Sequence, residues 1–261
     1  MTDGTQDSEN AATGRTPGLL KQLMSWTSEA WETMASRVSD NLASFIAERQ
    51  VLVWALAITI GIAVAYAATL FRSLLGAIQW LWLGTSSETM LIAAAEQYWF
   101  IILLAPVVGG LIVGQILYRF LPGGRAMGVA DVIEARALGD CKITTRTGLW
   151  SALAATVTLG FGGSAGREGP VVHLGATIAS WLEDKFTLTA TTRRTLLACG
   201  VAAAVSASFN APIAGVLFAQ EVILGHFSIR TFVPLVLSSV VATILSQAWF
   251  GDVAAFVVPE Y

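Results

Sequence analysis

The sequence predicts an all-α integral membrane protein. Of its 261 residues, 55% are hydrophobic, and the mean hydropathy is +0.66. Charged residues make up only 13%, against roughly 25% in a soluble domain. A soluble chain of this length would need more polar residues to cover its surface. The length and the apolar content together allow about seven or eight membrane spans.

The same composition excludes several other classes of protein. A net charge of −3 and the low charge content argue against a disordered or nucleic-acid-binding protein. Two cysteines, Cys141 and Cys199, and two distant histidines, His173 and His226, form neither a disulfide scaffold nor a zinc cluster. No nucleophile–base pair indicates an enzyme. We therefore expect no metal, no cofactor and no catalytic reaction.

The N-terminal part is the most polar and carries no secretory signal. Residues 1–17 are predicted to be disordered, and residues 18–50 to form an amphipathic helix that is too charged to span. This helix either packs on its own protein or lies in the membrane interface, and the two are compatible. In the segment 119–146, basic residues outnumber acidic ones, which predicts a cytoplasmic segment. We expect a multi-pass protein of a bacterial inner membrane with a cytoplasmic N-terminus.

The first two spans are predicted at residues 51–75 and 99–117, each long enough to cross the hydrocarbon layer. Arg72 is expected to snorkel from the end of the first span. In the second span, Gly110 and Gly114 form a small-xxx-small pair that would let another helix approach closely. A last span is expected at residues 232–250, and a short helix at 129–138 within the polar segment.

Between these spans the apolar runs become short and are interrupted by Gly, Pro and Asn. They cover residues 145–161, 171–182, 195–208 and 213–224. Several are too short to cross a bilayer alone, and such segments are typical of a binding site built from broken helices. Irregular backbone at membrane depth persists only where it is buried in protein or lines a wet cavity.

The most informative interruption is Gly166-Arg167-Glu168-Gly169-Pro170. Pro170 is typical of a helix start, so a helix over 171–182 would direct its free N–H groups and positive dipole end toward Glu168. Such an end binds anions, and a tethered carboxylate would compete with a free anion for it. Glu168 could be an ordinary helix-start acid, but an ionisable residue within an apolar chain favours a function.

These residues carry a family resemblance. Gly166–Pro170 followed by VVHLG resembles the second filter motif of CLC-type chloride channels and chloride/proton antiporters. The run LLACGVAAAVSASFNAPIAGVLFAQEV resembles the next helix pair of that family. The resemblance implies a CLC-like fold of broken and tilted helices, a homodimer, and one halide pathway in each subunit. Each subunit of the family contains two inverted repeats, and residues 51–261 resemble the first.

The resemblance also assigns site residues. Glu168 matches the gating glutamate, with Gly166, Arg167, Gly169 and Pro170 completing its motif. The first filter motif aligns with residues 126–130, where Gly128 and Val129 fit. Met127 replaces the serine that offers a hydroxyl to the central anion, and a methionine has no comparable donor. A methionine here resembles the fluoride-exporting branch of the family, so a fluoride/proton antiporter is the alternative to a chloride pathway.

The proton position of the family also differs. Glu221 matches the first of two adjacent glutamates, and Val222 occupies the place of the internal proton glutamate. Valine cannot relay a proton, which favours a passive channel and leaves open an antiporter with another internal route. Glu221 is expected to be structural, partnered by a basic residue such as Arg230. His173 is expected to pack or hydrogen-bond rather than to relay protons.

The resemblance ends after about one repeat. The third filter motif and the pore tyrosine of the family lie in the second repeat and have no counterpart here. We therefore expect a truncated product or a fragment that needs the missing repeat as a partner, in addition to the lipid bilayer. The second hypothesis is a membrane-embedded scaffold subunit that does not conduct.

Overall fold

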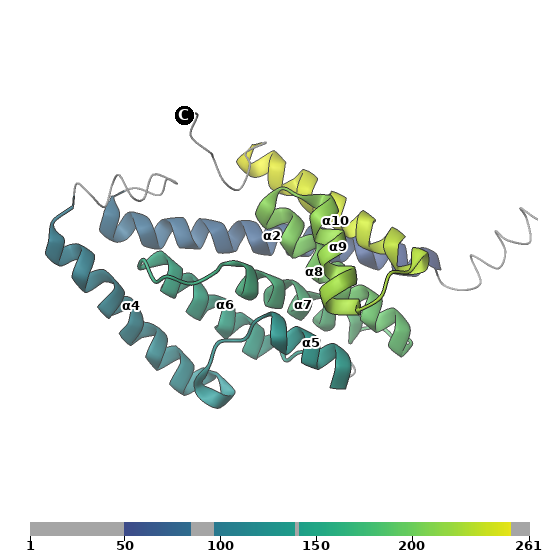
Figure 1. Cartoon of the computed structure of the whole chain (residues 1–261), viewed down its shortest axis with the longest axis horizontal. Helices are drawn as coiled ribbons and strands as arrows, with labels where there is room; N and C mark the ends of the chain where they lie inside the picture. Colours follow the sequence, from purple (N-terminus) through teal and green to yellow (C-terminus); the bar gives the residue numbers. More distant parts are fainter. Residues whose placement is uncertain (1–49, 85–96, 139–140, 252–261) are drawn as a thin grey trace, which may run out of the picture. The chain divides into compact units, whose positions relative to one another are not determined.

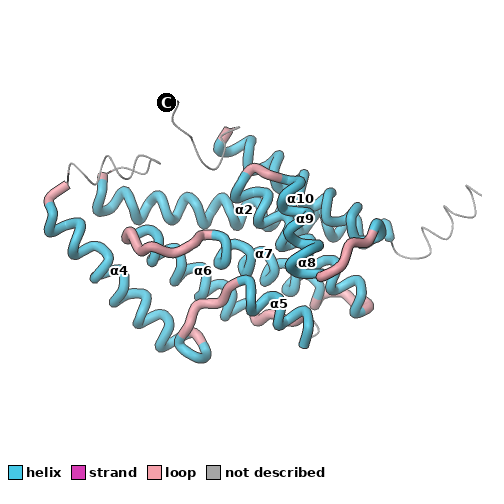
Figure 2. The backbone as a smooth tube through the Cα atoms, viewed as in Figure 1, coloured by secondary structure: helices cyan, strands magenta, loops and turns pink. Residues whose placement is uncertain are grey.

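The structure, a computed structural model, describes residues 50–84, 97–138 and 141–251. The predicted disordered segment 1–17 and nearly all of the predicted amphipathic helix 18–50 lie outside these residues. From Leu52 onward the described residues belong to one compact unit. Within it the described chain consists of helices joined by loops, as Figures 1 and 2 show, so the prediction of an all-α protein is confirmed.

Three of the described helices are long and apolar enough to cross a membrane, namely α2 (Gln50–Leu83), α4 (Trp99–Phe120) and α10 (Ile229–Phe250). Each exceeds the roughly 20 residues that a bilayer requires. The composition had allowed more than twice this number, because it counts every apolar residue regardless of how the helices are broken. The helices predicted at 99–117 and 232–250 are confirmed, each with a few more residues than expected.

The remaining helices are shorter or more polar. They are α5 (Val129–Leu138), α6 (Thr145–Gly160), α7 (Glu168–Glu183), α8 (Ala190–Phe209) and α9 (Pro212–Phe218), with a short 3-10 turn η1 (Pro122–Gly124) and a π-helical segment η2 (Ala219–Leu224). The predicted helix over 129–138 has the predicted bounds. The run 213–224 is one continuous apolar stretch that changes from α to π geometry after Phe218.

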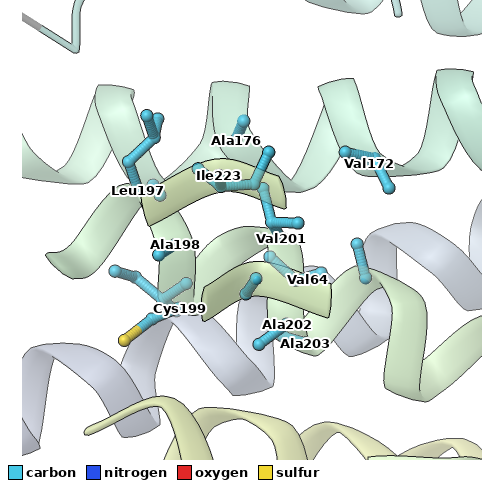
Figure 3. Packing of buried hydrophobic residues seen from close by; sticks show 14 of the residues in the cluster. Val64, Val172, Ala176, Leu197, Ala198, Cys199, Val201, Ala202, Ala203 and Ile223 are labelled. Atoms are coloured by element: carbon cyan, nitrogen blue, oxygen red, sulfur yellow. The ribbon is translucent and has the colours of Figure 1, made fainter. Parts of the chain in front are cut away.

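The core of this unit surrounds α8. Figure 3 shows Val201 and its neighbours on α8 packed among side chains from α2, α7 and η2, including Val64, Ala176 and Ile223. Helices α7 and α8 approach most closely at Gly175 and Gly200, where a Cβ on either glycine would collide with the carbonyl oxygen of the other. Small residues therefore let these two helices pack backbone against backbone, as is common in membranes.

The predicted close approach at Gly110 and Gly114 is wrong within the described chain. A Cβ at either position would meet no described atom within 4 Å, whereas a Cβ on Gly109 would collide with the side chain of Phe161. Most of α4 is apolar and exposed, including Leu103 and Leu111. The glycine pair therefore lies on the uncovered face of α4, and the contact with α6 uses the neighbouring glycine.

Two further expectations about helix ends are corrected. The first span continues to Leu83, so Arg72 lies inside α2 instead of at its end. Its guanidinium carbon lies 4.3 Å from the ring centroid of Phe250, a cation–π contact. Helix α7 starts at Glu168, two residues before Pro170. Pro170 is tolerated there because the first four N–H groups of a helix have no intrahelical partner.

Candidate functional site

The N-terminal ends of α5 and α7 meet, and they carry the two predicted filter segments. A Cβ on Gly169 would lie 3.8 Å from the Cα of Gly128, so these backbones are separated by ordinary van der Waals contact. Helix α5 begins directly after Gly128, and α7 begins at Glu168. Two positive dipole ends therefore come together, and this arrangement favours an anion.

The first segment is closed by its own side chains. The N–H of Gly128 donates to Asp131 Oδ2 at 2.7 Å, and the Arg125 guanidinium donates to both Asp131 oxygens at 3.1 and 2.5 Å. An acid at the third helical position that accepts from the N-cap amide is one half of a capping box. Burial alone would raise the pKa of Asp131, but the hydrogen bonds from Arg125 and Gly128 outweigh it and lower this pKa below its ordinary value.

A second contact holds Met127, the residue before Gly128. The N–H of Met127 donates to the hydroxyl oxygen of Ser151 at 2.7 Å, and that hydroxyl donates to the Met127 carbonyl at 3.2 Å. Ser151, on α6, is 1% exposed. The Met127 side chain packs beside Ile116 and Val157 in a small separate cluster. Since the amides of Met127 and Gly128 already have partners, the predicted anion donors of this segment are restricted to the amides from Val129 onward.

The second segment is open. Glu168 is exposed and has no hydrogen-bond partner among the described residues, and its carboxylate folds back over the Cα of Gly166. The guanidinium carbon of Arg167 lies 5.5 Å from the ring centroid of Phe209, at the end of α8. Arg167 therefore links α7 to α8, in line with a structural role. The residues around Glu168 thus place an exposed carboxylate at the start of α7.

The Phe-Asn-Ala-Pro junction has a clear backbone reason. Asn210 ends α8 in the left-handed conformation, with φ of 54°, and Pro212 opens α9. Asparagine tolerates the left-handed region, and proline is favoured at a helix start. The side chain of Gln247 on α10 donates to Asn210 Oδ1 at 2.7 Å. This junction fixes the end of α8 against which Arg167 rests.

The position of the family's proton glutamate lies in η2. Val222 is half-buried and packs against the core, whereas Glu221 and Arg230 are both exposed. In the part of the chain that is described, no ion pair joins Glu221 to Arg230, so that expected pairing is wrong. Instead the Arg136 guanidinium donates to the carbonyl of Leu224 at the end of η2 and ties α5 to this segment.

Three residues at or near the site escaped sequence reasoning. Asp131 follows Gly128 at the capping-box spacing, a signal that is readable in the sequence. Ser151 lies 24 positions from Met127 in a helix of ordinary composition, and no local pattern indicates the contact. Glu183, at the end of α7, is 1% exposed and lacks a hydrogen-bond partner for either carboxylate oxygen. His173 is 3% exposed, and its Nδ1 also lacks a partner.

Comparison with known proteins identifies the family. The family model described as voltage gated chloride channel matches residues 109–261, which is more than half of the chain. The chain belongs to this family. The resemblance drawn from the filter motifs is thereby confirmed, and the members of this family are integral membrane transporters and channels.

Individual relatives agree. A ClcB-like protein of Ralstonia nicotianae is 35% identical over 79% of this chain and 49% of its own length. Chloride channel protein CLC-e of Arabidopsis thaliana is 36% identical over 62% of this chain and 23% of its own. The crystal structure of a CLC-type fluoride/proton antiporter matches with a TM-score of 0.63 and 28% identity, covering 81% of this chain and 50% of that one. The chain thus spans about half the length of these bacterial and structural relatives, as one repeat would.

Proposed function

We propose that this chain supplies the first inverted repeat of a CLC-type anion pathway in which Glu168 is the gating residue. The observation that supports the proposal most directly is the meeting of two helix N-termini at Gly128 and Gly169, with an unpartnered carboxylate beside them. Amides at the starts of α5 and α7 would hold the anion. Protonation of Glu168, or movement of its carboxylate away from the start of α7, would free that helix end for the anion.

The transported ion is proposed to be a halide. Met127 offers no hydroxyl, and its amide is already held by Ser151, so selection would depend on backbone amides and on the size of the space. Chloride is the first candidate because the relatives are named chloride channels, and fluoride is the second. Met127 and the likeness to a fluoride/proton antiporter favour the second candidate.

The proposed surroundings follow from the same assignment. The protein would lie in a bacterial inner membrane as a homodimer, with its N-terminus and the segment 119–146 in the cytoplasm. It would need no cofactor. The second repeat would come from a continuation of the chain or from a separate partner.

The proposal is tested in liposomes. The 261-residue chain is reconstituted alone, and also after co-expression with the C-terminal half of the Ralstonia relative, and chloride and fluoride efflux are recorded. We expect efflux when both repeats are present, a strong response to pH, and a loss of this response in Glu168→Gln. Glu221→Gln is the matched control, because Glu221 is exposed and lies outside the site. No efflux in either preparation would contradict the transport function and favour a non-conducting scaffold subunit.

A further inference from the structure

Helix α7 carries a buried polar stripe that the anion site does not use. His173, Thr177, Ser180 and Glu183 follow one another at helical spacing, so their side chains share one face of α7. Each is at most 3% exposed. Buried polar groups in an apolar helix are costly, which makes a row of four of them unusual for a helix whose role is packing alone.

Three atoms of this stripe lack hydrogen-bond partners. Among the described residues, the buried side-chain nitrogens and oxygens without a partner are Arg136 Nε, His173 Nδ1 and both carboxylate oxygens of Glu183. The two hydroxyls between them are bonded. Thr177 donates to the His173 carbonyl at 2.7 Å, and Ser180 accepts from the N–H of Ile143 at 2.9 Å. The stripe therefore has free proton acceptors at both ends and hydroxyls in the middle.

The surroundings of Glu183 favour the neutral acid at rest. The nearby cation, Arg193, forms an ion pair with Asp184 at 3.5 Å, and no ion pair joins it to Glu183 among the described residues. A buried carboxylate without a hydrogen bond is far more costly than a carboxylic acid. The charged and titratable groups around this end of α7 are Cys141, Asp184, Arg136, Arg193, Arg194 and Cys199.

The opposite end of the stripe opens on a pocket. His173 lines a pocket of about 350 Å³ together with Met127, Asp131 and Glu134, and Asp131 is the carboxylate that acts on its imidazole. His173 thus lies beside the first filter segment. Glu168 is five residues back along the same helix, a rise of about 7.5 Å. A single helix therefore connects a buried acid, a histidine and the gating glutamate.

We propose that α7 itself holds a proton route, in which Glu183 takes up a proton near Cys141 and Ser180, Thr177 and His173 pass it toward Glu168. This inference rests on the proposed function, because the route serves the gating glutamate. Successive side chains from Glu183 to His173 are separated by a rise of about 4.5 to 6 Å, and His173 and Glu168 by about 7.5 Å, so the proposed route requires bridging waters between them. Each step moves one proton from a donor to the next acceptor, and Thr177 leaves the His173 carbonyl to take part. The route does not pass through Val222, which occupies the place of the family's internal proton glutamate.

The decisive measurement is the number of protons moved per anion. Both repeats are reconstituted in liposomes, an inward chloride or fluoride gradient is imposed, and anion flux and internal pH are recorded together. For Glu183→Gln we expect the proton-to-anion ratio to fall by at least about tenfold, since a positioned acid contributes that much or more to proton transfer. His173→Gln is expected to act similarly. Glu221→Gln, which changes an exposed acid outside the stripe, is the matched control and keeps the wild-type ratio.

A second measurement separates this proposal from the transport function. Infrared difference spectra of the 261-residue chain in lipid nanodiscs, recorded at neutral and alkaline pH, report protonated buried carboxyls whether or not the chain conducts. We expect such a band in the wild type and in Glu221→Gln, and its loss in Glu183→Gln. A wild type that moves anions without protons, an unchanged ratio in Glu183→Gln, or a Glu183 that is ionised at neutral pH would each overturn the proton route. A lack of anion flux would overturn the proposed function instead. The infrared spectra would still show whether Glu183 is protonated at neutral pH.

Discussion

The two filter segments lie against each other and differ in how their helix ends are satisfied. Before α5, the amides of Met127 and Gly128 are bonded to Ser151 and Asp131, and Arg125 holds Asp131 in turn. Before α7, the N-cap residue has no side-chain cap, and Glu168 has no hydrogen-bond partner among the described residues.

This difference indicates a division of labour. Backbone donors that already have side-chain partners are costly to release, so the start of α5 behaves as a fixed wall. Backbone donors at the start of α7 have only a tethered carboxylate nearby, and a free anion can compete with it. Two segments that meet at one site are thus expected to have different roles, and mutations should separate them.

The largest effect is expected at the open segment. Glu168→Ala removes the competing carboxylate, so anion efflux at neutral pH should rise by at least about tenfold. The efflux of this variant should not increase further on acidification, because the Glu168 carboxylate that would take up the proton is absent. Efflux from liposomes, recorded over a series of pH values, measures both the rise in efflux and the loss of its pH dependence. A Glu168→Ala variant whose efflux keeps the wild-type dependence on pH would contradict the gating role of the open segment.

The next effect is expected at the closed segment and concerns stability. Asp131→Leu leaves the Gly128 amide without its partner and Arg125 without its carboxylate. We expect a loss of about 1–3 kcal/mol, the cost of a buried donor left unsatisfied. Thermal unfolding of the purified protein in detergent, followed by circular dichroism, measures it. Glu168→Leu is the matched comparison, and an equal loss there would show that both helix ends are capped alike.

A smaller effect is expected for Ser151→Ala. The hydroxyl that bonds both the N–H and the carbonyl of Met127 disappears, and the side chain loses only its oxygen atom. A loss of about 1 kcal/mol is expected from one buried hydrogen-bonding group. The same unfolding assay applies. Thr158→Ala in the same helix is the control, because the Thr158 hydroxyl donates only to a carbonyl within α6. A Ser151→Ala variant as stable as this control would contradict a holding role.

The smallest effect is a pH dependence of stability. The pKa of Asp131 is lower in the folded protein than its ordinary value, so its contribution is present above that ordinary value, about pH 4, and is lost as the pH falls through the folded pKa. The loss is expected to be under about 1 kcal/mol because Arg125 is mostly exposed and solvent screens the pair. Asp131→Asn should unfold with a flatter dependence on acid pH. Parallel curves of stability against pH for the wild type and Asp131→Asn would contradict this prediction.

The sequence predicts much of the helical framework but not which helix faces are covered. The short helix at 129–138 was predicted with its observed bounds, since polar residues and a glycine frame it. The close contact of α4 was placed at Gly110 and Gly114, whereas Gly109 makes it. The same small-residue pattern is compatible with either position, and only the location of Phe161 distinguishes them.

The candidate site shows the same division. Glu168 and Gly128 are recognisable from motifs, and Asp131 could have been found by its spacing from Gly128. Ser151 and Glu183 could not, because a hydroxyl 24 residues from Met127 and an acid at a helix end look ordinary until packing buries them. The expected pair of Glu221 and Arg230 failed for the related reason that both side chains point away from the packed helices.

By itself, the sequence determined the membrane class, the family and the order of helices, because apolar content, helix breakers and short motifs are local properties of the chain. The tertiary structure decided which polar groups are satisfied. It closed one filter segment with Asp131 and Ser151, left Glu168 open, and buried Glu183 without a partner. Burial and hydrogen bonding depend on residues that are distant in the chain and meet only when the helices pack.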